Sequence, residues 1–340
     1  MNFLHLIRAL LLTLGVFGGG LLLSSCVREA EFENTANGNL EALWTIMDQH
    51  YCFFDYKEKT LGVNWDEIHS RYSRQVPANL AEEQLFEVMG NMLGELRDGH
   101  VNLSSAFDQA HNWSWKDDYP TNFSDSLLRR YLDNDYRIAS GMQYRKLDDN
   151  IGYLRCASFS GTIGDGNLDE ILYYLAPCNG LIIDIRSNGG GMLTSAETLA
   201  SRFTNSDVLA GYMQHKTGKG HNDFSGMEEQ WIHPSHRLRW QKPVVVLTNR
   251  GVYSAANEFV KYMRACGAII IGDHTGGGAG MPFSSQLPNG WGVRFSACPM
   301  YDANGQSTEH GIAPDHNIQM TDTDFHKGRD TIIEYARKLF

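Results

Sequence analysis

The sequence predicts an α/β domain with a largely parallel sheet, preceded by a small bundle of helices. Residues 151–271 alternate between apolar, β-branched runs and segments with helical periodicity, which is typical of strands joined by helical crossovers. Residues 37–100 carry helical periodicity before the first of those strands. Two glycine-rich loops follow expected strands, at the edge where parallel sheets collect their ligands.

The N-terminal helices are predicted by apolar residues that recur at spacings of three and four. They are expected within residues 37–51, 65–72 and 79–96. Asn79 with Glu82 three residues later has the pattern of a capping box, so the third helix is expected to begin there. Three short amphipathic helices are enough to form a small bundle.

The elements of the α/β domain are read in the same way, from apolar runs, helical periodicity and turn residues. Strands are expected at 151–156, 180–185, 244–247 and 268–271, helices at 164–175, 192–203 and from 254, and a hairpin at 289–290. Residues 105–150 have a weak pattern, with a helix at 124–133. The domain is therefore expected to start near Ile151.

The first 26 residues read as a targeting segment rather than as part of the fold. Arg8 precedes an apolar run at 9–23, and Ser24 and Ser25 lead to Cys26. This resembles a bacterial lipoprotein signal, which implies lipidation at Cys26 and a protein anchored in the cell envelope, on the periplasmic or surface face of a membrane. A single transmembrane anchor is the alternative, although the run is short for a bilayer.

Composition narrows the function. The chain has 340 residues and a formal net charge of −11, without the clustered Lys and Arg that bind phosphates, so no nucleic-acid partner is expected. Five cysteines remain after Cys26, an odd number without zinc-site spacing. We expect free thiols, and neither a metal nor a cofactor.

Ser254 is the first candidate for chemistry. It follows the strand 244–247 and a glycine turn, and it stands where a helix begins. Unpaired N–H groups and the positive end of the helix dipole stabilise developing negative charge at such a junction. An ordinary N-cap serine is the alternative.

His100 is the second candidate. It lies on a tight turn after the third helix, in the motif Asp98-Gly99-His100. Two loops, 184–191 and 272–280, offer backbone N–H groups from consecutive glycines, but neither has the spacing of a nucleotide-binding loop. Glu309 and His310 form a further pair on a late loop.

Five motifs in this order resemble the C-terminal processing peptidases, the serine peptidase family that includes tail-specific and tricorn-core proteases. They are DGH at 98–100, GLIIDIRSNGGG at 180–191, PVVVLTNRGVYSAANEF at 243–259, GDHTGGGAG at 272–280 and EHGIAPD at 309–315. The resemblance implies a crotonase-like fold. It divides the chain into a lipoprotein signal peptide at 1–26, a helical bundle at 27–100, a connecting segment without a PDZ domain at 101–150 and the peptidase domain at 151–340.

By position, the resemblance implies that Ser254 is the nucleophile and His100 the general base. The oxyanion hole is assigned to the N–H of Ala255 and that of Gly189 or Gly190. Glu309 matches the carboxylate that completes the charge network in tricorn-type members. The relay serine of that branch is replaced by Gly99, so Glu309 is expected to reach His100 directly, through water, or not at all. His274 and His310 are lesser candidates for the base or the orienting group.

The loop at 272–280 contains no lysine, so the residues exclude the Ser-Lys pair of the tail-specific branch. The function expected is a serine peptidase that hydrolyses peptide bonds in peptide or protein substrates; its oligomeric state is not readable. The alternative is a non-catalytic ligand- or peptide-binding protein on the same scaffold. A third hypothesis, an acyl-CoA enzyme, lacks any recognisable adenine or pantetheine site.

Overall fold

The computed structural model of the chain describes residues 31–113 and 116–340. Residues 34–340 form one compact unit. The expected signal segment and its lipidation residue, Cys26, lie outside the described residues. None of the described helices is both long enough and apolar enough to cross a membrane.

Four helices open the described chain, where three were expected. They are α2 (Ala36–His50), α3 (Phe54–Leu61), α4 (Trp65–Ser73) and α5 (Glu82–Gly94). Helix α3 was missed because it is short and polar, and its buried face includes a lysine, Lys57. The expected capping box is wrong: Ala81 precedes α5 and no side chain caps this helix. By contrast, the Thr35 side chain accepts the N–H of Gly38 and caps α2.

The main sheet has seven strands in the order β13-β10-β9-β6-β5-β4-β3. Five are parallel: β5 (Gly152–Arg155), β6 (Leu181–Asp184), β9 (Val244–Thr248), β10 (Ile269–Gly272) and β13 (His316–Asn317). Two strands that lie before Ile151, β3 (Arg137–Ala139) and β4 (Met142–Lys146), extend it in antiparallel fashion. The largely parallel sheet predicted from the sequence is confirmed, and it begins earlier than expected.

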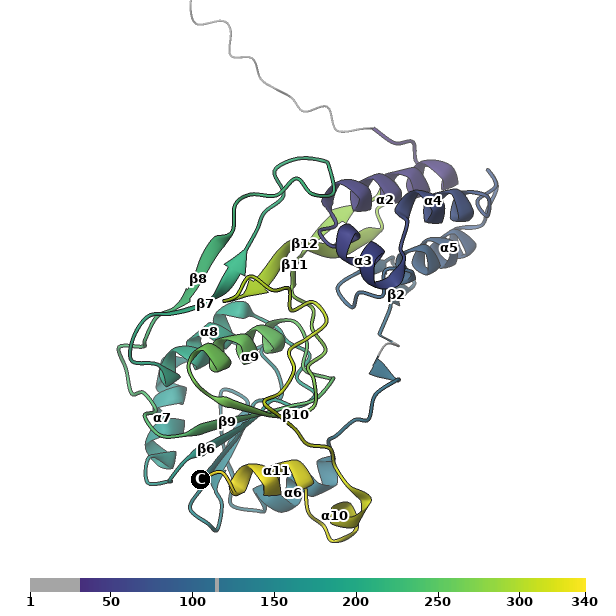
Figure 1. Cartoon of the computed structure of the whole chain (residues 1–340). Coiled ribbons are helices and arrows are strands. Elements are labelled where there is room, and N and C mark those ends of the chain that lie inside the picture. Colours follow the sequence, from purple (N-terminus) through teal and green to yellow (C-terminus); the bar gives the residue numbers. More distant parts are fainter. Residues whose placement is uncertain (1–30, 114–115) are drawn as a thin grey trace, which may run out of the picture. The chain divides into compact units, whose positions relative to one another are not determined.

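Helices cover both faces of this sheet, as Figure 1 shows. On one face, α7 (Asp165–Leu175), α8 (Leu193–Ala200) and α9 (Ala255–Ala265) bury apolar stripes in the larger core cluster. On the other, α6 (Asp125–Leu132) and α11 (Thr331–Arg337) pack on a smaller cluster, and the short α10 (Asp322–His326) precedes α11. Burial on both faces explains why the central strands are continuous apolar runs rather than alternating ones.

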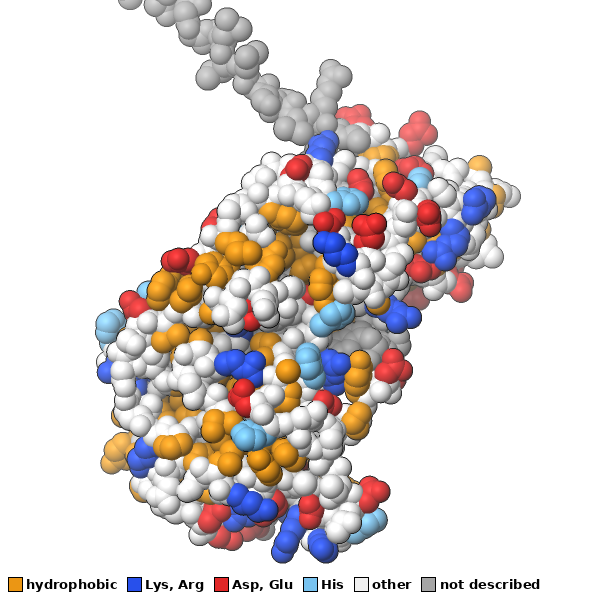
Figure 2. Space-filling model, in the orientation of Figure 1, with side chains coloured by type: hydrophobic (Ala, Val, Ile, Leu, Met, Phe, Trp, Pro, Cys, Tyr) orange, Lys and Arg blue, Asp and Glu red, His pale blue; other side chains and the backbone are white. Residues whose placement is uncertain are grey.

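A second, antiparallel sheet was foreseen only in part. It contains β1 (Asn102–Ser104), β2 (Gln109–His111), β7 (Val208–Met213), β8 (Glu228–Ile232), β11 (Gly280–Gln286) and β12 (Gly292–Asp302). The expected hairpin is the β11–β12 pair, while β1 and β7 join β12 from distant parts of the sequence. In Figure 2, hydrophobic side chains gather over part of this sheet. Trp231 of β8 and Phe283 of β11 are exposed. Strand β12 pairs with β1, which follows the turn after α5, and also with β7. It therefore holds that turn against the α/β part of the chain.

A buried ionic cluster lies at the carboxyl end of β6. Arg186 donates to Asp184 at 2.6 Å and to Asp330 at 2.8 Å, and Arg155 lies 3.7 Å from Asp184. The hydroxyl of Tyr153 also donates to Asp184, at 2.6 Å. Burial by itself raises the pKa of Asp184, but Arg186 and Arg155 lower it to about 2. We call these residues the sheet cluster.

Candidate active site

Ser254 lies between β9 and α9 in a conformation that side chains rarely adopt. Its φ is 58° and its ψ is −127°, and its N–H donates to the carbonyl of Gly277 at 2.9 Å. The Ser254 side chain makes no capping hydrogen bond to α9. The N-cap alternative is therefore wrong. The strained backbone instead turns the hydroxyl away from the helix, as is common for residues at functional sites.

His100 meets that hydroxyl from the turn after α5. Its Nε2 atom lies 2.9 Å from Ser254 Oγ, although the two residues are 154 positions apart in the chain. The His100 ring is buried and packs against Tyr253, with ring centroids 5.0 Å apart. The two residues singled out by the sequence thus lie in hydrogen-bond contact, at a distance suitable for proton transfer.

The other ring nitrogen of His100 faces a carboxylate through a hydroxyl. His100 Nδ1 lies 3.5 Å from Ser296 Oγ, and Ser296 Oγ donates to Asp98 Oδ2 at 3.0 Å. Asp98 also accepts the hydroxyls of Tyr51 and Tyr253, at 3.1 and 3.2 Å, and the N–H of His100 at 2.8 Å. With Nε2 accepting from Ser254, the consistent tautomer carries its proton on Nδ1, directed toward Ser296.

Burial raises the pKa of Asp98, but Lys57, His100 and the hydrogen-bond donors lower it below its usual value, so Asp98 is held as a carboxylate. Burial lowers the pKa of His100 to about 4; Asp98 opposes this shift and Arg294 adds to it. His100 is therefore neutral near pH 7. A neutral imidazole with a free lone pair on Nε2 is the form that a general base requires.

Glu309 lies in the same buried region but is bonded to other groups. Its Oε1 is 3.4 Å from Lys57 Nζ, and its Oε2 accepts the N–H of Ala279 at 2.9 Å. Within the part of the chain that the structure describes, no hydrogen bond joins Glu309 to His100. Burial and the charge of Asp98 raise the pKa of Glu309 more than Lys57 lowers it. Asp98, not Glu309, is thus the carboxylate linked to the imidazole.

The glycine loop after β6 packs directly on the Ser254 turn. Gly190 has a φ of 98°, and a Cβ there would lie 2.8 Å from Ser254 Cβ. The N–H of Gly190 already donates to Asn188 Oδ1 at 2.9 Å. No hydrogen bond joins the N–H of Gly189 or Ala255 to another described residue. Of the two glycines named by the sequence, Gly189 is therefore the one with a free donor.

A pocket of about 320 Å³ opens over these groups. Its lining is Gly99, His100, Trp113, Ser158, Ser160, Gly189, Gly190, Gly191, Tyr253, Ser254 and Arg294. His274 and His310 do not line it; His274 contacts Arg250, and His310 packs against Tyr56. Among the described residues, no group of three metal-binding side chains converges.

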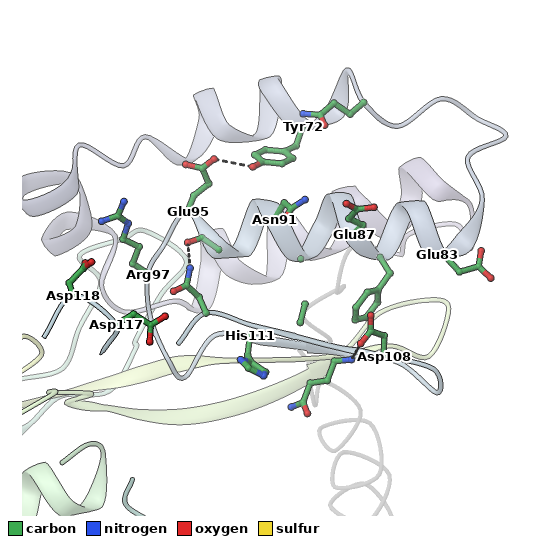
Figure 3. Close-up of a pocket in the computed structure, with 17 residues that line it drawn as sticks. Tyr72, Glu83, Glu87, Asn91, Glu95, Arg97, Asp108, His111, Asp117 and Asp118 are labelled. Atoms are coloured by element: carbon green, nitrogen blue, oxygen red, sulfur yellow. Dashed lines mark hydrogen bonds between the residues drawn. The ribbon is translucent and has the colours of Figure 1, made fainter. Parts of the chain in front are cut away.

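A larger pocket, of about 1170 Å³, lies elsewhere, between α4, α5 and β2. Figure 3 shows Glu83 and Glu87 on α5 and Glu95 directly after it on one side of the pocket, with Tyr72 donating to Glu95. Neither Ser254 nor His100 lines this pocket. Its size does not make it the reactive site.

Three contributors to the site escaped the sequence analysis as functional residues. Asp98 was visible as part of the DGH motif, two positions before His100, and its position next to a candidate base was a usable signal. Ser296 lies inside an apolar strand and carried no signal. Lys57 reads as a solvent-exposed residue in a polar helix, yet it is buried.

The model of peptidase family S41 matches residues 150–318, and that of the tricorn protease C1 domain matches residues 32–94. A candidate peptidase from Parabacteroides merdae has 49% sequence identity and a TM-score of 0.85, covering 90% of this chain and 97% of its own. The chain belongs to peptidase family S41. It is thereby placed among the serine-type peptidases, and the sequence-based assignment to the C-terminal processing peptidases is confirmed.

More distant relatives of this S41 chain are found both by sequence and by structure. The carboxy-terminal processing protease CtpA of Bacillus subtilis is 25% identical over 178 residues, which cover 52% of this chain and 36% of that protein. The chain thus spans about a third of that relative. The structure of mature CPAF complexed with lactacystin is 14% identical, with a TM-score of 0.70, over 90% of this chain and 97% of that one. The predicted sheet-and-helix domain behind an N-terminal helical region is confirmed.

Proposed function

We propose that this chain hydrolyses peptide bonds in peptide or protein substrates through an acyl-enzyme on Ser254, with His100 as the general base. The observation that carries the proposal is the 2.9 Å contact between Ser254 Oγ and His100 Nε2 at the base of a pocket. A serine hydroxyl is a weak nucleophile near neutral pH and requires such a base. The non-catalytic alternative has no observation in its favour.

In the first half of the reaction, Ser254 Oγ attacks the carbonyl carbon while His100 Nε2 takes the hydroxyl proton. The carbonyl oxygen becomes an oxyanion, which the N–H groups of Ala255 and Gly189 receive. Loss of one such donor typically costs about 3 kcal/mol of transition-state stabilisation. His100 then gives its proton to the leaving amine, and the C–N bond breaks. In the second half, water attacks the ester, with His100 again as base, and releases the acid and Ser254.

Each time His100 takes a proton, it becomes an imidazolium in a buried site. Its Nδ1–H then donates toward Ser296 Oγ, whose own proton is directed to the carboxylate of Asp98. Asp98 stays ionised and stabilises the new positive charge. Glu309 contributes less directly, because it fixes Lys57 beside Asp98 and binds the backbone at Ala279.

The test is labelling by a fluorophosphonate probe, which phosphonylates an activated serine. Wild-type protein is expected to gain one adduct, located by mass spectrometry at Ser254, and Ser254→Ala and His100→Ala are expected to gain none. Ser70→Ala, at an exposed serine of α4, serves as the matched control and should label as wild type does. Equal labelling of wild type and Ser254→Ala would overturn the proposal.

We propose further that the chain is tethered to a membrane of the cell envelope through a lipid on Cys26. The support is the sequence pattern that ends at this cysteine. Metabolic labelling with a clickable fatty acid in a bacterial host should mark the wild-type protein and not Cys26→Ala. Equal incorporation in both would exclude this anchor.

A further inference from the structure

Strand β12 presents two polar side chains to the catalytic region, one behind the other. Ser296 and Arg294 are two positions apart and therefore project from the same face of the strand. Ser296 is fully buried beside His100, whereas Arg294 is exposed and lines the pocket that contains Ser254. At about 3.3 Å per residue, the two side chains start roughly 7 Å apart. Arg294 thus stands at the entrance of the site.

Arg294 differs from the arginines that stabilise the fold. Within the described chain, its guanidinium makes no hydrogen bond or ion pair, whereas Arg186 and Arg202 are each bonded to two carboxylates. None of the described side chains that line this pocket is acidic, and Arg294 is the one permanently charged group among them. It is nevertheless close enough to the reacting groups for its charge to lower the pKa of His100.

An unpaired cation at this position should slow catalysis unless a group on the substrate neutralises its charge. The positive charge of Arg294 opposes the imidazolium that His100 must form. A bound carboxylate would neutralise Arg294 and so remove this opposition. A guanidinium binds a carboxylate through two parallel hydrogen bonds, which fixes both its place and its orientation. The remaining lining of hydroxyls, glycines and the Trp113 ring is uncharged and offers no competing cation.

We propose that Arg294 binds a carboxylate of the peptide substrate next to the scissile bond, so that this pocket prefers substrates carrying a negative charge there. The inference rests on the proposed peptidase function, because it names the substrate class of the same site. An acidic side chain and the carboxyl terminus of a peptide share this chemistry. Binding also couples to catalysis, since a neutralised Arg294 makes protonation of His100 easier.

The experiment uses acetylated nonapeptides on a common background of Ala and Leu. Glu or Gln is placed at each position in turn, and each peptide is made with a free acid and with an amide terminus. Wild type is expected to show a kcat/KM for one carboxylate series roughly 10- to 100-fold above its neutral partner, the range typical of a charge-assisted contact. Arg294→Gln should reduce this ratio to near one, and Arg294→Lys should retain part of it.

The ratio cancels any change in His100 that Arg294→Gln causes regardless of the substrate, because such a change alters the rate for both members of a pair equally. Arg74→Gln, which removes an exposed arginine at the C-cap of α4 and outside this pocket, is the matched control and should keep the wild-type ratio. Collapse in the Glu/Gln pairs identifies an acidic side chain, and collapse in the acid/amide pairs identifies the carboxyl terminus. A ratio near one in wild type, or one unchanged in Arg294→Gln, overturns the inference.

A binding measurement distinguishes failure of this inference from failure of the peptidase proposal. Ser254→Ala protein is titrated with the same peptides in a calorimeter, and Ser254→Ala/Arg294→Gln is its partner. Preferential binding of carboxylate peptides that depends on Arg294 would support the inference even if wild type cleaved nothing. Equal binding of charged and neutral peptides to Ser254→Ala would overturn it, whatever the turnover.

Discussion

Two buried ionic clusters differ in how their charges are balanced. The sheet cluster contains two carboxylates, Asp184 and Asp330, and two guanidinium groups, those of Arg155 and Arg186. The second cluster, which we call the site cluster, contains Asp98, Glu309 and one cation, Lys57. Both are shielded from solvent, but the site cluster has only one cation for its two carboxyl groups.

The difference between the clusters appears in the pKa values of their carboxyl groups. Arg186 and Arg155 lower the pKa of Asp184 to about 2, whereas burial and the charge of Asp98 raise the pKa of Glu309. In the sheet cluster each carboxylate has an arginine partner, so the charges are balanced without the uptake of a proton. We therefore expect this cluster to have a structural role. In the proposed reaction, His100 becomes a second cation beside Asp98 when it takes the proton of Ser254. The two clusters thus suggest different roles: the sheet cluster is balanced at rest, and the site cluster has a carboxylate in place for a charge that the proposed reaction would create.

The largest effect is expected from Asp98→Asn, which removes the charge that awaits the imidazolium. kcat should fall by roughly 1,000- to 10,000-fold, as when the carboxylate of a Ser-His-Asp triad is converted to an amide. Fluorophosphonate labelling rates and peptide hydrolysis measure the loss, and thermal melting checks the fold. Asp148→Asn, at an almost fully exposed side chain, is the control. Near wild-type kcat in Asp98→Asn would contradict the role given to the site cluster.

The sheet cluster is expected to fail through stability instead. Arg186→Met leaves Asp330 without its ion pair and Asp184 with Arg155 alone, and breaking a buried pair typically costs about 3–5 kcal/mol. The surface variant Arg264→Met should cost no more than about 1 kcal/mol. Urea unfolding gives both values. If the two variants were equally stable, the sheet cluster would not be structural.

Ser296→Ala sharpens the comparison by cutting the link between His100 and Asp98. Asp98 keeps the hydrogen bonds from Tyr51, Tyr253 and the His100 N–H, so the fold should persist. We expect kcat to fall by roughly 10- to 100-fold, the usual effect of one buried hydrogen bond to a charged group. The kcat/KM of wild type should stay constant as the pH falls until His100, with a pKa of about 4, becomes protonated. Ser296→Ala should shift this acid limit. An unmoved acid limit together with unchanged kcat would refute the link.

The smallest effect is expected from Glu309→Gln, because the raised pKa of Glu309 makes the uncharged amide a close substitute. kcat should change by less than about tenfold. In wild type, the folded state holds the Glu309 proton more tightly than the unfolded state, so this residue's contribution to stability falls as pH rises above the unfolded pKa and through the raised folded one. Melting curves between pH 4 and 9 should show this slope in wild type and its loss in the variant. A fall in kcat as large as that of Asp98→Asn would make Glu309 the orienting carboxylate instead.

Most helices and strands of the α/β domain can be predicted from local sequence patterns. Apolar runs gave the central strands, helical spacing gave α2, α4, α5, α7 and α9, and the junction after β9 singled out Ser254. These features depend on neighbours a few residues apart, so their signal survives in one dimension. The same reasoning placed His100 on its turn and the glycine loop at the end of β6. It failed at α3 and β7, whose patterns are short or irregular.

Which groups meet in space follows from the three-dimensional fold alone. Ser296 meets His100 across 196 positions because β12 pairs with β1, and Lys57 meets Glu309 across 252 positions. The fold also links Asp98 rather than Glu309 to His100 through Ser296, and it places Asn188 where its side chain accepts the N–H of Gly190. The physical reason is that burial, hydrogen-bond satisfaction and pKa depend on all groups within a few ångströms, and distance in space is not encoded in local sequence patterns.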